Sequence, residues 1–271
     1  MEATVELGPR QLILSLYGLY ARAEGSWLSV ASVIALMEEL GVDGAAVRSS
    51  VSRLKRRGVL EAVRRDGRAG YALSEEALEV LREGDTRIWS RPRASLEDGW
   101  LVVVFSVPEA EREKRHALRS TLARLGFGTA APGVWVSPGT AYDETARALQ
   151  RQGLSSYTEF FRGDYLGSGD VASRMREWWD LDELEKLYDA FRIAWEPALS
   201  APRRPQARDA FATYVPMLTA WRRLPYLDPG LPLEHLPPDW AGIRAGEVFT
   251  TLDQRLREPA AEFALSVVHD A

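Results

Sequence analysis

The order of patterns between Pro9 and Leu73 constrains the fold of this chain most strongly. Three segments with helical spacing of apolar residues come first, at about 9–24, 30–40 and 44–57. Two short alternating segments, 59–63 and 70–73, then flank a polar tip whose Asp66-Gly67 pair is typical of a tight β-hairpin turn. Three helices followed by a hairpin predict a winged helix-turn-helix, which we place in a domain at residues 1–90.

Local signals support these helix boundaries. Ser29 and Asp43 precede the second and third helical segments, where a side-chain oxygen can cap the first backbone N–H groups. Gly58 follows the third segment and suits a helix end. Ser74 caps a further helix predicted from Glu75 toward Trp89.

Positive charge is concentrated in this region. Eight basic and two acidic residues lie between Gly44 and Gly70, a net charge of +6. Since the whole chain carries −5, the rest carries −11. DNA affinity depends on phosphates neutralised locally, so a compact basic segment counts for more than the whole-chain charge.

The third helical segment has the two faces of a DNA-recognition helix. Val47, Val51 and Leu54 fall on one side, and serines and arginines fall on the other. Arginine can bind guanine with two hydrogen bonds, and the hairpin tip suits phosphates or the minor groove. The predicted DNA-binding residues are Arg48, Ser49, Ser52, Arg53, Lys55, Arg56, Arg57, Arg64, Arg65 and Arg68.

A face rich in serine and arginine also occurs on helices that only meet solvent. RNA binding or a protein-interaction module built on a winged helix are further alternatives. The three helices, the short turn and the basic hairpin in this order favour double-stranded DNA.

The middle of the chain changes to an α+β pattern. Trp100–Val107 is a nearly continuous apolar run, which is typical of a buried strand. Predicted helices at 111–125 and 140–152 alternate with predicted strands at 133–137 and 157–162. The pattern predicts an α+β fold with a ferredoxin-like βαββαβ domain at 97–168. Residues 169–271 are predicted to form a mostly helical domain, with a surface loop at 225–240 and separate helices at 241–257 and 260–269.

Several blocks in this same order resemble the PaaX family of bacterial regulators. The blocks are AVRSSVSRLKRRGVL (Ala46–Leu60), GRAGYALSEEAL (Gly67–Leu78), WLVVVFSVPE (Trp100–Glu109), LRSTLARLGFG to PGVWVSP (Leu118–Pro138) and LPYLDPGLPLEHLPPDWAG (Leu224–Gly242). The resemblance covers nearly the whole chain.

The resemblance implies a homodimeric repressor of phenylacetate or aromatic-acid catabolic genes. It further implies release from operator DNA by an aryl-CoA thioester such as phenylacetyl-CoA. A constitutive DNA-binding regulator or scaffold without an effector is the alternative.

The effector would need an apolar slot for its acyl group and cations for its phosphates. The candidate residues lie near the junction of the central and helical regions: Trp135, Arg162, Tyr165, Arg174 and Trp178. Tryptophans at such a junction also commonly serve only to seal the core. We predict that residues 90–96 form the hinge that couples this region to the DNA-binding domain.

We expect no catalytic or metal centre and no cofactor. The three histidines, His116, His235 and His269, lie far apart and in no metal-ligand spacing. A metal-dependent nuclease on the ferredoxin-like domain is a less favoured alternative, because the first strand carries no carboxylate before Glu109.

Composition sets the expected compartment. The chain has no cysteine, no apolar run near the roughly 18–20 residues that cross a bilayer, and an acidic start unlike a secretory signal. We therefore expect a cytoplasmic protein without a membrane partner.

Overall fold

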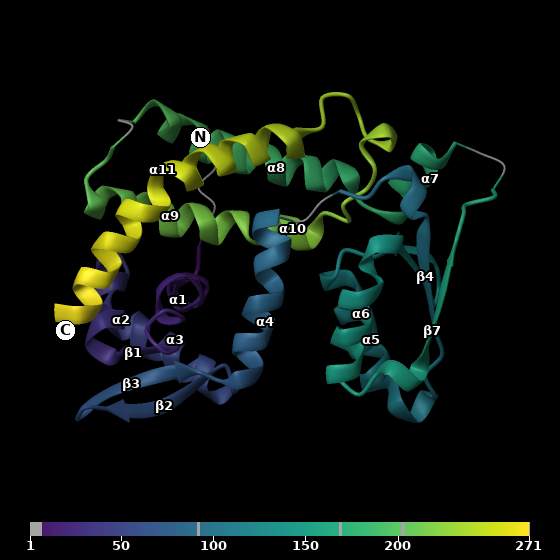
Figure 1. Cartoon of the computed structure of the whole chain (residues 1–271). Coiled ribbons are helices and arrows are strands. Elements are labelled where there is room, and N and C mark those ends of the chain that lie inside the picture. Colours follow the sequence, from purple (N-terminus) through teal and green to yellow (C-terminus); the bar gives the residue numbers. More distant parts are fainter. Residues whose placement is uncertain (1–6, 91–92, 168–169, 202–203, 271) are drawn as a thin grey trace. The chain divides into compact units, whose positions relative to one another are not determined.

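The computed structural model describes residues 7–90, 93–167, 170–201 and 204–270, and it is a mixed α and β structure with two antiparallel sheets (Figure 1). The helices are α1 (Pro9–Leu16), α2 (Val30–Glu39), α3 (Gly44–Arg56), α4 (Glu75–Asp85), α5 (Arg112–Arg124), α6 (Tyr142–Arg151), α7 (Val171–Trp178), α8 (Leu181–Trp195), α9 (Ala207–Trp221), α10 (Leu224–Leu227) and α11 (Ala241–Asp270). The strands are β1 (Trp27–Ser29), β2 (Leu60–Arg65), β3 (Arg68–Leu73), β4 (Trp100–Phe105), β5 (Gly128–Ala131), β6 (Val134–Pro138) and β7 (Thr158–Gly163).

The N-terminal elements follow the predicted order, and the caps predicted at Ser29, Asp43 and Ser74 are present. The Ser29 hydroxyl accepts from Ser32 N at 2.9 Å, and the Asp43 carboxylate accepts from Ala45 N and Ala46 N, both at 2.9 Å. β2 and β3 pair through an Asp66-Gly67 turn in which both residues have positive φ, 50° and 77°. Strand β1, which was not predicted from the sequence, pairs with β3 and completes a sheet of order β1-β3-β2.

The central region has the predicted βαββαβ order, with strand order β5-β6-β4-β7 and every pair antiparallel. Leu101, Val103 and Trp135 are buried under α5 and α6. Because side chains alternate along a strand, Trp100, Val102 and Val104 lie on the opposite face of β4. β5 was missed because GTAA has only one β-branched residue, Thr129, beside glycine and alanine, which are depleted in strands.

The chain forms two compact units. Unit 1 contains residues 1–90, 189–222 and 244–271, and unit 2 contains residues 91–188 and 223–243. The helical region after residue 169 thus contributes to both units. The hinge predicted at 90–96 includes Arg91 and Pro92, which lie outside the described residues.

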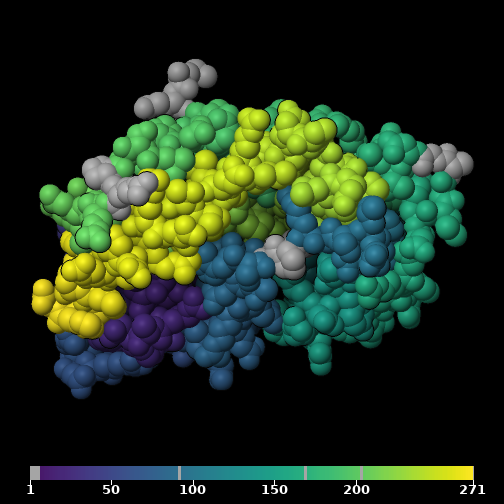
Figure 2. Space-filling model, turned by 45° about the horizontal axis from the view of Figure 1, so that its top comes forward, coloured from purple at the N-terminus to yellow at the C-terminus, as the bar shows by residue number. Residues whose placement is uncertain are grey.

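In unit 1 the C-terminal helices cover the N-terminal ones. Thr219 of α9 donates to Ser15 of α1 at 2.7 Å in a buried contact, and Phe211 of α9 packs on Tyr20 and on Phe263 of α11. Figure 2 shows the end of α11 lying against the N-terminal segment. An ion pair between Arg208 and Glu39 joins the start of α9 to the end of α2.

Three predictions about local structure were wrong. The segment 225–240 is not a surface loop, because Leu231 and Trp240 are each 1% exposed and Asp228 is 5% exposed. Helix α11 continues through Pro259 instead of ending before it. The helix predicted at 140–152 begins only at Tyr142, because a 3-10 turn over Gly139–Ala141 precedes α6.

Candidate nucleic-acid interface

The packing of α3 decides which of its side chains are available to a partner. Val47, Val51 and Leu54 are at most 5% exposed and face the core of unit 1. Gly41, with φ of 76°, turns the chain between α2 and α3. The opposite side of α3 is therefore presented to solvent as one continuous face.

The predicted recognition residues lie on this exposed side. Ser50 is buried, but the other two serines of α3 and the basic side chains of α3 and its C-cap are exposed: Arg48, Ser49, Ser52, Arg53, Lys55, Arg56 and Arg57. Apart from a long 3.4 Å contact between Arg53 and Ser50, no hydrogen bond or ion pair joins these side chains to other described residues. Four of these cations lie together in the last turn and at the C-cap of α3: Arg53, Lys55, Arg56 and Arg57. They form a surface suited to phosphates and guanine edges.

Arg65 differs from the other predicted hairpin residues. Its guanidinium donates to the carbonyls of Glu24 and Gly25, at 3.3 and 3.0 Å, and its Cζ lies 5.5 Å from the centre of the Trp27 ring. These contacts anchor β2 to the turn before β1. Arg64 instead donates to Gly67 O within the exposed tip, at 3.0 Å, and Arg68 is also exposed there.

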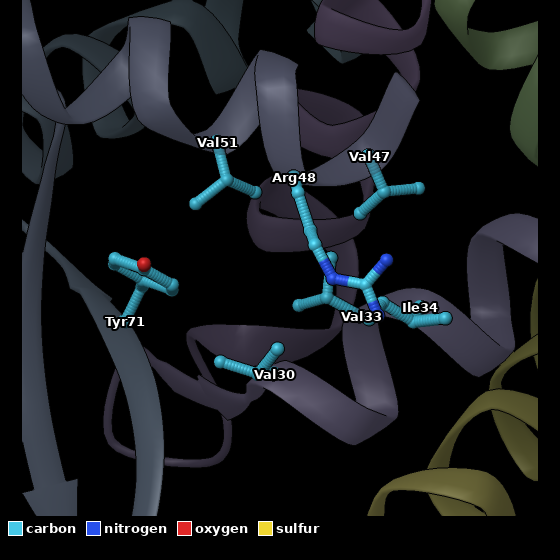
Figure 3. Close-up of a pocket in the computed structure, with 7 residues that line it drawn as sticks. All are labelled: Val30, Val33, Ile34, Val47, Arg48, Val51 and Tyr71. Atoms are coloured by element: carbon cyan, nitrogen blue, oxygen red, sulfur yellow. The ribbon is translucent and has the colours of Figure 1, made fainter. Parts of the chain in front are cut away.

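A small cavity of about 60 Å³ lies between α2, α3 and β3. Its lining is apolar apart from one arginine and one tyrosine: Val30, Val33, Ile34, Val47, Arg48, Val51 and Tyr71 (Figure 3). The Arg48 guanidinium lies beside Val33 and Ile34, so this side chain flanks α3 instead of projecting from its serine-rich face. The space is far below the roughly 300–1,000 Å³ of small-molecule sites.

The structure brings together three of the five predicted effector residues, all in unit 2. The rings of Tyr165 and Trp178 meet edge to face, with centroids 5.5 Å apart. Arg174 forms an ion pair with Glu177 at 2.6 Å, and hydrogen bonds to Glu177 and Tyr165 raise the pKa of its guanidinium. A positive charge thus lies beside an aromatic cluster.

The other two predicted residues lie elsewhere. Trp135 is buried under α5 and α6, on the face of the sheet opposite Trp100, whose ring meets Trp178 at 5.8 Å. Arg162 pairs with Leu101 across β7 and β4 and donates to Asp98 O at 2.9 Å. These two side chains therefore do not join the cluster around Trp178.

Two further tryptophans complete that cluster and were missed in the sequence analysis. Trp100 meets both Trp178 and Trp179, and Trp179 lies so close to Gly128 that a Cβ there would be 2.7 Å from its ring. The adjacent α7–α8 turn, from Arg176 to Asp182, lines a cavity of about 280 Å³. The alternation of side chains along β4 predicts that Trp100 and Leu101 lie on opposite faces of the sheet. No pattern in the sequence predicts that Trp178, in helix α7, packs against Trp100.

The carboxylates considered for metal chemistry do not converge. Glu109 lies beyond the end of β4 and pairs with Arg115 at 2.9 Å. Among the described residues, no group of three or more histidine, aspartate or glutamate side chains is arranged to hold a metal ion. Within that same part of the chain, no helix has the length and apolar character needed to cross a membrane.

Comparison with known proteins gives matches along almost the entire chain. Residues 8–77 match a family described as PaaX-like protein, residues 93–175 match the PaaX protein central Cas2-like domain, and residues 179–266 match the PaaX-like protein C-terminal domain. A curated relative, the transcriptional repressor PaaX of Escherichia coli K12, is 27% identical over 268 residues, covering 96% of this chain and 84% of the relative. An uncharacterized Mycobacterium tuberculosis protein has a similar solved structure, with a TM-score of 0.58, 22% identity, and coverage of 96% of this chain and all of that one.

We predict that Arg65 stabilises the hairpin more than it contributes to DNA contact. Arg65→Ala should lower the free energy of unfolding by about 1 kcal/mol, because two hydrogen bonds and a cation–π contact are lost. Urea unfolding followed by circular dichroism measures this difference. Arg57→Ala is the matched control and should unfold like the parent protein; equal stability of both variants would contradict the anchoring role.

Proposed function

We propose, because the chain belongs to the PaaX family of transcriptional regulators, that it represses transcription by binding operator DNA through a winged helix-turn-helix. In this proposal α2 and α3 form the helix-turn-helix, and β2 and β3 form the wing. Similarity to a transcriptional repressor points to a regulator and away from an enzyme. The observation that carries the DNA-binding proposal is the exposed basic face of α3, opposite its buried valines.

The division of labour on this surface follows from side-chain position. Ser49, Ser52 and Arg56 lie on the exposed face of α3 and can reach base edges in the major groove. Arg64 and Arg68, at the tip of the hairpin, suit the phosphate backbone, where contacts strengthen binding without reading sequence. We assign Arg65 an anchoring role on the contacts described above.

We further propose that an aryl-CoA thioester, of the phenylacetyl-CoA class, is the effector that releases the operator. The ring cluster of Trp100, Tyr165 and Trp178 supports a site for an aromatic acyl group, and Arg174 supplies a cation beside it. Such a ligand relieves repression only if it binds the DNA-incompetent state more tightly. Genes for aromatic-acid catabolism are the corresponding targets. A constitutive repressor without an effector is the second candidate.

A homodimer would give two recognition helices to a two-fold symmetric operator. The open side of the central sheet supports a dimer surface in unit 2. Val104 and Phe161 on this side are 36% and 57% exposed. Phe161 pairs with Val102 across β7 and β4, and Val104 lies two residues further along β4 on the same side. We propose that a second copy of this chain covers them, because an exposed apolar sheet face is otherwise unfavourable in water.

Base reading and phosphate contact have different signatures. Arg56→Ala should cost about 1–3 kcal/mol on the operator and much less on random DNA. Arg68→Ala should weaken binding to both duplexes alike and reduce the salt slope by about one. Fluorescence anisotropy over a salt series measures both effects, using a labelled duplex from upstream of the encoding gene and a scrambled duplex. Equal losses on the two duplexes for Arg56→Ala would reject its base-reading role.

The effector site can be tested by titration calorimetry with phenylacetyl-CoA. Arg174→Ala and Trp178→Ala should each weaken binding by about tenfold or more, because a charged contact or a stacking surface is lost. Arg112→Ala, an exposed arginine of α5 in the same unit, is the control and should bind normally. Unchanged affinity in the first two variants would remove this site, and the same titration of Arg162→Ala and Trp135→Ala decides whether those residues take part.

If two copies associate through this surface, a charged side chain introduced there should prevent dimer formation. Phe161→Glu should yield a monomer in sedimentation equilibrium at micromolar concentration, because a carboxylate would be buried against Val104 of the second copy. Leu166→Glu is the control, since Leu166 is 92% exposed beyond the end of β7. A Phe161→Glu protein that remains dimeric, or a parent protein that is monomeric, would reject this surface.

A further inference from the structure

One buried carboxylate collects hydrogen bonds from several distant segments of unit 2. Asp228 is 5% exposed. Its Oδ2 accepts from the Arg93 guanidinium at 2.6 Å and from the Tyr188 hydroxyl at 2.7 Å, and its Oδ1 accepts from Gly230 N at 2.7 Å. Arg93 also donates to Leu231 O at 3.2 Å. Neither the predicted DNA-binding surface nor the predicted effector cluster includes these residues.

Asp228 and its side-chain partners each lie close in sequence to a point where the chain passes from one unit to the other. The chain passes from one unit to the other after Ser90, after Tyr188, after Arg222 and after Ile243. Arg93 follows the first passage closely, and Tyr188 is the last residue before the second. Asp228 follows the third passage, at the C-terminal end of the short helix α10. The carboxylate thus joins the unit 2 ends of three connections.

The fourth connection meets the same group through ring packing. Trp240 precedes the fourth passage, is 1% exposed, and meets the Tyr188 ring edge to face at 6.1 Å. A Cβ on Gly242 would be 2.5 Å from Trp240 Nε1 and 3.0 Å from the Tyr188 ring, so the backbone approaches both rings closely. We call Arg93, Tyr188, Asp228 and Trp240 the Asp228 cluster.

We propose that the Asp228 cluster couples ligand binding in unit 2 to DNA binding in unit 1. The inference rests on the proposed function, because it concerns how an effector in one unit changes operator affinity in the other. Any movement of one unit against the other is carried by the four connections. Three of these are held by a single carboxylate, and the fourth is packed on one of its donors.

The chemistry of the cluster favours discrete arrangements over gradual ones. A buried carboxylate tolerates little loss of its donors, because an unpaired charge in a low-dielectric interior is strongly unfavourable. Trp240 Nε1 is buried without a hydrogen-bond partner among the described residues. A buried donor that lacks an acceptor leaves room for a second arrangement in which it is satisfied. A two-state element that both ligands bias is what allosteric coupling requires.

Two tyrosines allow a matched test. Tyr188 and Tyr214 are both buried, and each donates to an aspartate at 2.7 Å, to Asp228 in unit 2 and to Asp253 in unit 1. Tyr188→Phe and Tyr214→Phe therefore remove the same group from similar surroundings, but only the first touches the cluster. Thermal melts of both proteins establish that they are folded before binding is measured.

The first measurement is release of the upstream duplex by phenylacetyl-CoA, followed by anisotropy. The parent protein and Tyr214→Phe should release at the same thioester concentration, whereas Tyr188→Phe should need about tenfold more, the equivalent of one lost charge-assisted hydrogen bond. Equal release by all three proteins would overturn the coupling role and leave the proposed function intact. A parent protein that binds DNA but never releases it would instead reject the proposed effector.

A second measurement decides the inference without the thioester. Coupling is reciprocal, so DNA bound to unit 1 must change the state of unit 2. Hydrogen exchange of α7 peptides should change on adding the duplex to the parent protein and to Tyr214→Phe, and should stay unchanged in Tyr188→Phe. The same change in all three proteins, or a change in none, would overturn the proposal. Asp228→Asn gives an independent check, because it keeps the shape and removes the charge.

Discussion

Unit 1 depends on the burial of α1 against α9. The contact joins Ser15 to Thr219 and brings Phe211 onto Tyr20, so residues about two hundred positions apart share one interior. The helices that carry the basic face are consequently supported by the C-terminal part of the chain. Hydrophobic burial over this interface, more than any hydrogen bond in it, gives α3 a rigid base.

Unit 2 depends in the same way on strand β4, because both faces of this strand are apolar and pack against other side chains. Leu101 and Val103 are sealed by α5 and α6, while Trp100 meets Trp178 on the other side. Val104, further along the same side, remains exposed. The proposed effector cluster and the proposed dimer surface therefore share one face of one strand, and a ligand that displaces Trp178 would act next to the surface that a second copy covers.

Local physics explains which sequence predictions succeeded. The caps at Ser29 and Asp43 and the Asp66-Gly67 turn depend on a few consecutive residues, so their geometry follows from the residue types alone. The prediction that Trp135 and Trp178 lie together was wrong. The alternation of side chains along β6 and the packing of α7 put them on opposite faces of the sheet. The buried segment around Asp228 was misjudged because its prolines resemble a surface loop, whereas a proline-rich backbone also has fewer N–H groups to satisfy when buried.

The sequence by itself determined most of the order of helices and strands, the basic face of α3 and the family to which the chain belongs, since each follows from periodicity, charge or collinear motifs. Only the tertiary structure showed that Arg65 is an anchor, that Trp100 joins Trp178, and that Asp228 gathers the connections between the units. These depend on contacts between residues far apart in the chain. Such contacts are decided by which surfaces bury one another, and no local pattern encodes that choice.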